Sequence, residues 1–381
     1  MPLDPETFEL LRSGVARFVT ERLIPREEEV VEHNAVPADV VAEMRDLGLF
    51  GLAIDEEHGG LGLGMEEEVG VVLELGRASP AFRSVAGTNI GIGSQALVIA
   101  GTPEQRRRYL PPLASGELIG SFALTEPEAG SDALSLRTTA RRDGDDYILN
   151  GTKRYITNAP TAGLFTVMAR TAPERRADAI SCFLVPAGTP GLHLGQPDRK
   201  MGQRGALTCD VVFEECRVPA DALLGGQEGN GFRTAMKVLD KGRLHIAALC
   251  VGAADRLIEE TLRYARERRQ FGQAIGEFQL VQAMLADSQA EAYAARCMVL
   301  DAARLRDRGA ATTMQAACAK MFASEMVGRV ADRAVQIFGG AGYMAEYPVE
   351  RFYRDVRLFR LFEGTTQIQQ LVIAREMLKA A

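Results

Sequence analysis

Hydrophobic spacing changes twice along this chain of 381 residues, and the order of the changes limits the folds open to it. Apolar residues recur at helical spacing to about residue 120, alternate in short runs, and return to long helical repeats after about residue 226. Helices and strands segregated in this way do not form alternating βαβ units, which argues against a doubly wound dinucleotide fold. The sequence predicts an α+β multidomain fold with an N-terminal α-helical domain (1–120), a middle β-barrel or sandwich domain (121–226) and a C-terminal four-helix bundle (227–381).

The two helical regions differ in the lengths of their elements. Glycine and proline interrupt the first region often, so we expect five or six helices there. The last region has broad, alanine-rich apolar faces that allow close helix packing, in patterns over residues 232–268, 278–309, 312–338 and 366–379. In the middle region, runs bounded by turn residues predict strands that include 147–149, 165–169, 180–185 and 210–213.

Composition excludes several classes of function. A net charge of −7 argues against a nucleic-acid surface or a basic membrane patch, and no long uncharged apolar run predicts membrane insertion. The six cysteines and four histidines have no metal-ligand spacing, and the first residues do not resemble a secretory signal, so we expect a cytoplasmic protein without metal. A strict G-x-G-x-x-G sequence is absent, and the relaxed matches at 91–96 and 340–345 follow no predicted strand, so classical NAD binding is not supported.

One acidic residue near the C-terminus, Glu363, stands at the end of a basic and aromatic stretch and is followed directly by a glycine. A carboxylate in apolar surroundings loses hydration, its pKa rises, and it becomes a usable base near neutral pH. A second interpretation is an acid that opens the helix over 366–379, because acids stabilise the positive end of a helix. The segment alone does not decide between them.

Three further segments could bind a ligand, and each has a plainer explanation. Residues 124–132 offer hydroxyls and backbone N–H groups, although composition alone favours a structural turn. Tyr155 and Thr157 are two residues apart on a predicted strand, so their side chains face the same side. They could line the binding site of a flat, ring-shaped ligand, or they could belong to an ordinary strand edge. Residues 267–272 carry positive charge suited to phosphate, or form a solvated helix end.

Together these pieces resemble the flavin-dependent acyl-CoA dehydrogenase family over essentially the whole chain. The resemblance rests on the α–β–α order and on five segments that follow one another in the family's order: 124–132, 155–158, 268–272, 336–340 and 362–367. It implies an FAD cofactor, an acyl-CoA substrate, and the removal of an α-proton and a β-hydride to give a trans-2-enoyl-CoA.

The resemblance also assigns residues to the cofactor. The family often has tryptophan where this chain has Tyr155, a departure that still allows stacking beside the flavin. Arg268, Gln270 and Phe271 resemble the segment that grips the FAD of a neighbouring subunit, which implies a homotetramer built as a dimer of dimers. The implied FAD contacts are Phe122, Leu124, Thr125, Gly130, Ser131, Tyr155, Ile156, Thr157, Arg268, Gln270, Phe271, Gln279, Gln336, Ile337, Gly339, Gly340, Thr365 and Gln367.

Glu363 matches the family's base. Some members place the base on the helix that here carries Gly242, so that alternative position is empty. The implied substrate contacts are Ser131, Asp240, Arg243, Phe362, Gly364 and Arg375, although Asp240 and Arg243 could simply pair across one helical turn.

The acyl group is left open between two possibilities. The default is a short- to medium-chain acyl-CoA. Arg83 suggests a dicarboxylyl substrate, because glutaryl-CoA dehydrogenases carry an Arg-Ser pair at the same spacing before Gly101; a surface helix arginine is the plainer explanation. Two rival classes are a flavin oxidase on this fold and a non-catalytic member. The resemblance names an electron-transferring flavoprotein as the electron acceptor.

Overall fold

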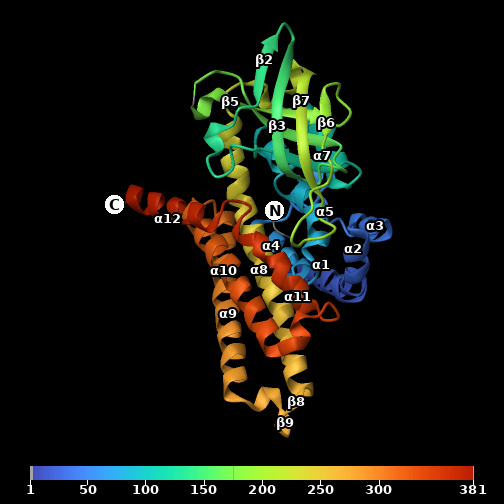
Figure 1. Cartoon of the computed structure of the whole chain (residues 1–381). Helices are drawn as coiled ribbons and strands as arrows, with labels where there is room; N and C mark the ends of the chain where they lie inside the picture. Colours follow the sequence, from blue (N-terminus) through green and yellow to red (C-terminus); the bar gives the residue numbers. More distant parts are fainter. Residues whose placement is uncertain (1–2, 175, 381) are drawn as a thin grey trace.

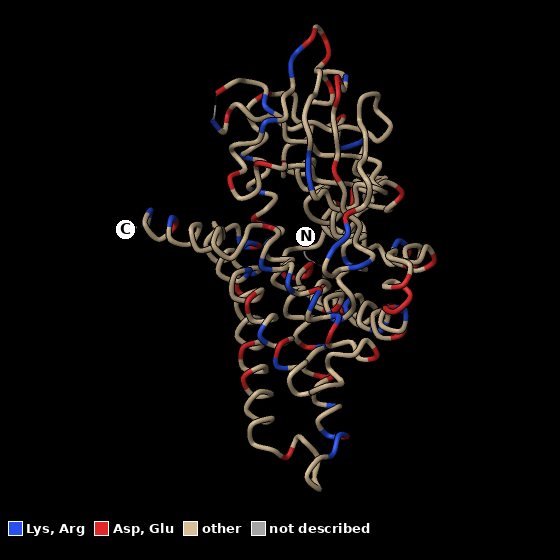
Figure 2. Tube along the Cα trace, in the orientation of Figure 1, with Lys and Arg blue, Asp and Glu red and all other residues tan. Residues whose placement is uncertain are grey.

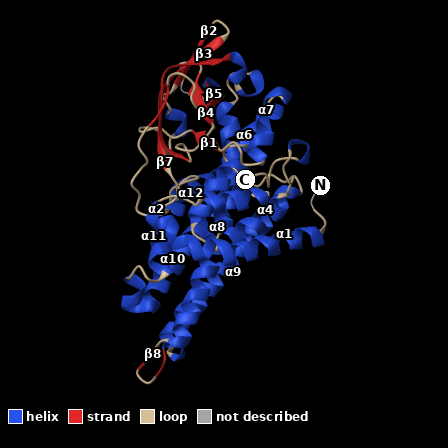
Figure 3. Ribbon diagram, turned by 90° about the vertical axis from the view of Figure 1, so that its right-hand side faces the viewer, coloured by secondary structure: helices blue, strands red, loops and turns tan. Residues whose placement is uncertain are grey.

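The computed structural model describes residues 3–174 and 176–380, and it confirms the predicted order of helices, sheet and helices (Figures 1 and 3). Seven α-helices, rather than five or six, precede the sheet in the described chain. The region divides more finely than expected because its helices are short; Thr102, for example, caps a new one by accepting a hydrogen bond from the N–H of Gln105 at 3.2 Å. The bounds are Pro5–Phe18 (α1), Glu27–His33 (α2), Ala38–Asp46 (α3), Met65–Leu75 (α4), Pro80–Ile90 (α5), Gln95–Ala100 (α6) and Pro103–Ala114 (α7).

The middle region forms one sheet at one end of the molecule (Figure 1). Its described strands are Gly120–Ala123 (β1), Thr139–Asp143 (β2), Asp146–Thr157 (β3), Leu164–Arg170 (β4), Ile180–Pro186 (β5), Leu192–Leu194 (β6) and Thr208–Pro219 (β7). The order is β1-β4-β2-β3-β7-β6, and β5 pairs with β4. β1 runs parallel to β4, while β3 runs antiparallel to β2 and β7. The four predicted strand runs lie inside β3, β4, β5 and β7, so the β domain is confirmed.

The C-terminal region is built on long helices that extend away from the sheet (Figures 1 and 3). α10 packs against α8, α9, α11 and α12. The predicted ends of the four long helices agree with the structure to within two residues, whereas α11 was not predicted. The bounds are Gly231–Glu267 (α8), Gln279–Asp307 (α9), Thr313–Phe338 (α10), Pro348–Val356 (α11) and Thr366–Ala380 (α12), with a short hairpin of Arg269–Gln270 (β8) and Gln273–Ala274 (β9) after α8.

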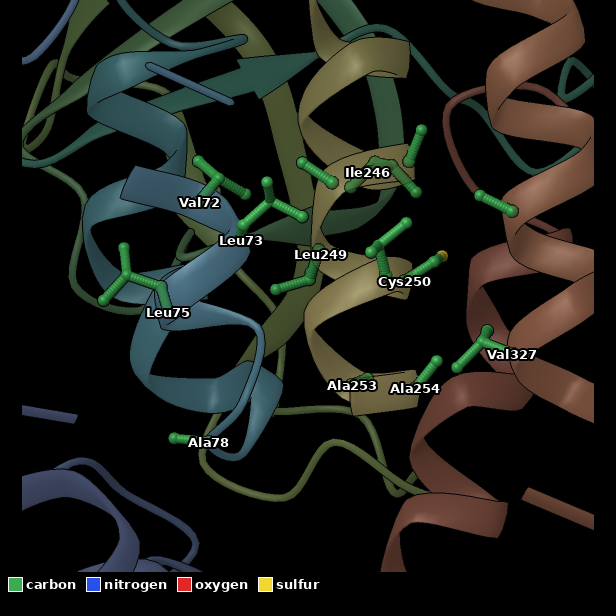
Figure 4. Packing of buried hydrophobic residues seen from close by; sticks show 14 of the residues in the cluster. Val72, Leu73, Leu75, Ala78, Ile246, Leu249, Cys250, Ala253, Ala254 and Val327 are labelled. Carbon is green, nitrogen blue, oxygen red and sulfur yellow. The ribbon is translucent and has the colours of Figure 1, made fainter. Parts of the chain in front are cut away.

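One hydrophobic core joins the two helical regions. Val72 and Leu73 of α4 face Leu249 and Ala253 of α8, and Val327 of α10 closes the cluster from the other side (Figure 4). A second cluster lies under the sheet, where the first part of α8 contributes Ala235 and Val238 to contacts with α6, α7 and β5. α8 therefore belongs to both cores and fixes the sheet relative to the bundle. None of the helices in the described chain has an apolar stretch of the length that a bilayer crossing requires.

Candidate active site

A cavity of about 800 Å³ lies where the three parts of the chain meet. It is lined by α5, the loop after β1, the end of β3, α8, the loop before α12, and α12 itself. All the residues that the sequence assigned to catalysis and substrate line this cavity: Arg83, Ser131, Asp240, Arg243, Phe362, Glu363, Gly364 and Arg375. The structure therefore brings together residues that are 292 positions apart in the sequence at the extremes, Arg83 and Arg375.

Glu363 lies in the loop between a 3-10 turn, Arg357–Arg360, and α12. Its φ of 54° is left-handed, a conformation that few residues other than glycine adopt, and Gly364 follows with a φ of 88°. The Oε2 atom is buried and has no hydrogen-bond partner among the described residues. A Cβ atom at Gly242 would lie 2.8 Å from that oxygen, so the carboxylate is fitted against bare backbone of α8.

The electrostatic surroundings of Glu363 are those expected for a base. Burial raises its pKa, and the positive charges of Arg83, Arg243 and Lys320 oppose that effect. The alternative role of an acid that opens α12 is not supported, because α12 begins at Thr366 and Thr365 supplies the cap, its Oγ1 accepting from the N–H of Ile368 at 3.2 Å.

Two residues that sequence reasoning missed hold this loop. The Nζ of Lys320, in α10, donates to the carbonyl of Gly364 at 2.7 Å. The Nε2 of Gln369, in α12, donates to the carbonyls of Glu363 at 3.1 Å and Gly364 at 3.0 Å. The available signal for Lys320 was a lone lysine on an alanine-rich helix face, since buried ammonium groups are rare without a specific partner.

Arg83 points into the cavity from α5, so its interpretation as a surface arginine is wrong. A Cβ atom at Gly87, one turn later, would lie 2.7 Å from the Cζ of Arg83, and the guanidinium occupies that space. Its Nη2 lies 3.5 Å from the Nδ1 of His245, and its Nε is buried without a partner among the described residues. Burial lowers the pKa of Arg83, which the charge of Glu363 opposes.

A buried row of polar groups stands behind Arg83 and was also missed. The Nε2 of His245 lies 2.8 Å from the Oε2 of Glu68, whose Oε1 lies 2.7 Å from the Nζ of Lys241. Burial lowers the pKa of His245, so the imidazole is neutral at pH 7 and its Nδ1 can accept from Arg83. The row places an acceptor, the Nδ1 of His245, beside the guanidinium.

Asp240 and Arg243 do form the one-turn pair that the sequence allowed. The Nη1 of Arg243 lies 2.5 Å from the Oδ1 of Asp240, and the Oδ2 of Asp240 accepts from the hydroxyl of Thr313 at 2.9 Å. Both side chains nevertheless line the cavity, and the Nε of Arg243 is buried without a partner in the described chain. A role in binding CoA stays a prediction.

The cavity wall toward the sheet is formed by the segments expected to contact the flavin. The loop after β1 is fixed by Lys153, whose Nζ donates to Glu126 at 2.7 Å and to the carbonyl of Leu124 at 3.2 Å. The residues that line the wall are Phe122, Leu124, Thr125, Gly130, Ser131, Tyr155, Ile156 and Thr157. Hydroxyl donors beside an aromatic side chain and apolar groups fit the polar edge and flat face of an isoalloxazine.

Tyr155 departs from regular strand geometry. Its φ is 58°, and the pairing of β3 with β7 shifts in register between Lys153 and Ile156. This bulge lets the three consecutive residues 155–157 all line the cavity, which the simple alternation of side chains did not predict. Tyr155 is 60% exposed, and the guanidinium of Arg154 lies 4.9 Å from the centre of its ring.

The second set of predicted cofactor residues surrounds a different cavity, of about 660 Å³, at the far end of the bundle. Arg268, Gln270, Ile337, Gly339 and Gly340 line it. Figure 2 shows basic residues at this tip, where α8 ends. The remaining predicted cofactor contacts lie outside both cavities in the described chain, and their role stays a prediction: Phe271, Gln279, Gln336, Thr365 and Gln367.

Comparison with known proteins decides the family. Models of the acyl-CoA dehydrogenase N-terminal, middle and C-terminal domains match residues 5–117, 121–216 and 229–378 in turn. The chain belongs to the acyl-CoA dehydrogenase family. It is therefore a flavin-dependent oxidoreductase, and its cofactor is FAD.

Alignments with similar proteins extend over almost the whole of this acyl-CoA dehydrogenase. It is 44% identical to the probable acyl-CoA dehydrogenase YngJ of Bacillus subtilis, over 97% of this chain and 98% of the relative. The structure of butyryl-CoA dehydrogenase from Megasphaera elsdenii matches at a TM-score of 0.95 and 34% identity, over 99% of both chains. The complex of glutaryl-coenzyme A dehydrogenase with glutaryl-CoA matches at 0.94 and 32% identity, over 100% of this chain and 97% of that one.

Proposed function

We propose that this acyl-CoA dehydrogenase converts a short- to medium-chain acyl-CoA thioester to the trans-2-enoyl-CoA, with Glu363 as the base that takes the α-proton. The observation that carries the proposal is the buried Oε2 atom of Glu363, which has no hydrogen-bond partner in the described chain. Buried polar atoms are normally paired, so an unpaired carboxylate oxygen beside a ligand cavity marks a group that acts on a ligand. Bound FAD supplies the acceptor for the β-hydride.

The loop that carries Glu363 also supports stabilisation of the developing negative charge. An α-proton beside a thioester is too weakly acidic for a carboxylate in water, so the thioester oxygen needs hydrogen-bond donors. The backbone N–H of Glu363 has no acceptor among the residues that the structure describes, and we assign it this role. Ser131, Arg243 and Arg375 line the same cavity and are the groups that we expect to orient the CoA part.

A second candidate substrate is a dicarboxylyl-CoA such as glutaryl-CoA. Arg83 favours it, because the guanidinium enters the cavity near Glu363 and its Nε has no partner in the described chain. A carboxylate at the end of the acyl chain would pair with it, whereas a plain alkyl chain would leave it buried and unpaired. Similarity to butyryl-CoA dehydrogenase supports the short acyl chain, and similarity to the glutaryl-CoA complex supports the dicarboxylate.

Anaerobic titration of the holoenzyme tests these proposals. We expect butyryl-CoA or octanoyl-CoA to bleach the visible flavin band, and bleaching by glutaryl-CoA alone would transfer the assignment to the dicarboxylyl substrate. We expect Glu363→Gln to keep its flavin and to lose at least about 100-fold in the rate of reduction, because general-base catalysis contributes that much. Normal single-turnover reduction in this variant would contradict the assignment of the base.

The same preparation separates the rival classes. Oxygen consumption during turnover would identify an oxidase, and a bound flavin that no thioester reduces would favour a non-catalytic member. We propose an electron-transferring flavoprotein as the physiological acceptor, which a coupled reduction assay with and without that protein would test.

We also propose a homotetramer built as a dimer of dimers. The predicted FAD contacts of one chain are divided between the first cavity and the tip of the bundle. From Gly242 to Arg268 the helix α8 rises about 39 Å at 1.5 Å per residue, so two subunits that share each cofactor explain the division better than one chain does.

A further inference from the structure

Lys320 is a buried cation without an ion pair. Its side chain is 0% exposed on a face of α10 made of alanines, and no carboxylate lies within 4.0 Å of its Nζ in the described chain. Its hydrogen bond goes to the carbonyl of Gly364 at 2.7 Å. Burying an ammonium group costs free energy unless a specific arrangement offsets the cost, so its presence beside the loop of Glu363 calls for a function.

The position of Lys320 differs from that of the other cations around Glu363. Arg83 from α5 and Arg243 from α8 line the cavity, where a ligand can compete for them. Lys320 approaches from α10, behind the loop, and is not among the cavity residues. Its positive charge is thus available whatever ligand is bound.

Apart from Arg83, the charged side chains near the loop are already paired, and Cys250 of α8, which faces Lys320, is a thiol whose pKa burial raises. Asp240 is bound to Arg243, and Glu325 is bound to Arg360 at 3.0 Å and to the hydroxyl of Thr366 at 2.7 Å. α12 contributes the neutral Gln369, and His245 behind Arg83 is neutral as well. Lys320 remains as the cation that both contacts this loop and has no acidic partner of its own in the described residues.

We propose that Lys320 is a positioning residue for proton transfer: it holds Glu363 and Gly364 in their left-handed conformation and stabilises the ionised carboxylate. The inference rests on the proposed function of Glu363. In the reaction the carboxylate gains the α-proton, the electrons of the C–H bond form the new double bond as hydride leaves the β-carbon for FAD, and Lys320 keeps its proton. Burial lowers the pKa of Lys320 to about 8, so it is mostly protonated at neutral pH.

The test compares three variants by anaerobic single-turnover reduction with butyryl-CoA across pH, with the visible spectrum as the measure of bound FAD. Lys320→Met removes both the hydrogen bond and the charge, Lys320→Gln keeps a donor without charge, and Gln369→Leu removes the neutral donor to the same carbonyls. We expect Lys320→Met to reduce the rate at pH 7 about tenfold or more and to move the rising limb of the pH profile to higher pH.

The other variants separate charge from shape. Lys320→Gln should move the rising limb of the pH profile to higher pH as well, with a smaller loss of rate. Gln369→Leu should lower the rate and leave the rising limb at the wild-type pH. Lys237→Met, an exposed lysine on α8, is the matched control and should match the wild type.

Each result decides. A flavin-loaded Lys320→Met protein with the wild-type rate and limb would overturn the inference while leaving Glu363 as the base. If Lys320→Met does not retain FAD, the pH profile of Lys320→Gln is used instead: a rising limb at the wild-type pH would overturn the inference. A wild-type flavin that no CoA thioester reduces would instead contradict the proposed function itself, and the role of Lys320 with it.

Discussion

A single methyl group at position 242 would test how closely the carboxylate of Glu363 is fitted to α8. The glycine there has an ordinary helical environment, and its missing side chain leaves the space that the Oε2 atom occupies, 2.8 Å from an added Cβ. The proposed base therefore depends on two residues 121 positions apart, one that carries the carboxylate and one that makes room for it.

We expect Gly242→Ala to slow flavin reduction about 100-fold, since a displacement of roughly 1 Å in a reacting group costs about that much. Stability should not fall, because alanine favours a helix over glycine by about 1 kcal/mol. Stopped-flow reduction and Tm measure the two effects. Gly14→Ala is the control, since a Cβ there meets nothing within 4 Å, and a normal rate in Gly242→Ala would show that the carboxylate lies elsewhere.

At the scale of elements, α11 is linked to the loop between β6 and β7 through one buried acid. Asp355 is 2% exposed and accepts a hydrogen bond from the backbone N–H of Gln203, whose Nε2 donates to the carbonyl of Asp355 at 3.1 Å. Burial raises the pKa of Asp355 from 3.8 to about 6, against the opposing effects of that hydrogen bond and of nearby arginines. Gln203 also lines the first cavity, so this link positions part of the wall.

A pH-dependent stability follows from Asp355. Between pH 3.8 and about 6 the folded protein binds the proton more tightly than the unfolded chain does, so the contribution of Asp355 to stability falls as pH rises through this window. The difference corresponds to on the order of 3 kcal/mol, at 1.36 kcal/mol per pH unit. We expect Asp355→Asn to gain in Tm relative to the wild type from pH 4.5 to 6.5, and Asp145→Asn at an exposed turn to track the wild type. A constant Tm difference would contradict the assignment.

The long elements could be predicted from the sequence, and the local irregularities could not. α8, α9 and α10 are long enough for their apolar spacing to give the ends to within two residues. α11 escaped prediction although its apolar residues lie at helical spacing, because a helix of nine residues gives a short pattern and two of its buried positions, Arg351 and Asp355, are charged. The family segment singled out Glu363, which the structure places in the cavity wall. Lys320 and His245 were missed because a lone polar residue on an apolar helix carries no motif, and only the fold shows what each one faces. The bulge at Tyr155 depends on the pairing of β3 with β7, which a single strand does not encode.

At the scale of the whole molecule, the two cavities lie at opposite ends of α8. Gly242 lines one and Arg268 the other, and both carry residues expected to contact FAD. Sites completed by a second subunit would make oligomerisation a condition of activity.

Subunit mixing tests this division of the site. Glu363→Gln lacks the proposed base and Arg268→Ala lacks the arginine at the tip, so we expect each homo-oligomer to be impaired. If subunits share sites, co-refolding the two variants should restore flavin reduction, because a subunit with an intact base then receives an intact tip from its neighbour. Mixed oligomers, verified by distinct affinity tags, that stay as inactive as the parents would contradict sharing.

The continuity of α8 also restricts which changes of length the gene can accept. Each inserted residue would turn everything beyond it by about 100° and push it about 1.5 Å further along the axis. A one-codon insertion anywhere between Gly242 and Arg268 would rotate the end of α8 relative to Ile337 and Gly340, which line the same cavity, while leaving Gly242 beside Glu363. We expect homologous genes to vary in length at exposed turns such as that around Gly188. Along α8 we expect them to keep the same number of residues between the two cavities.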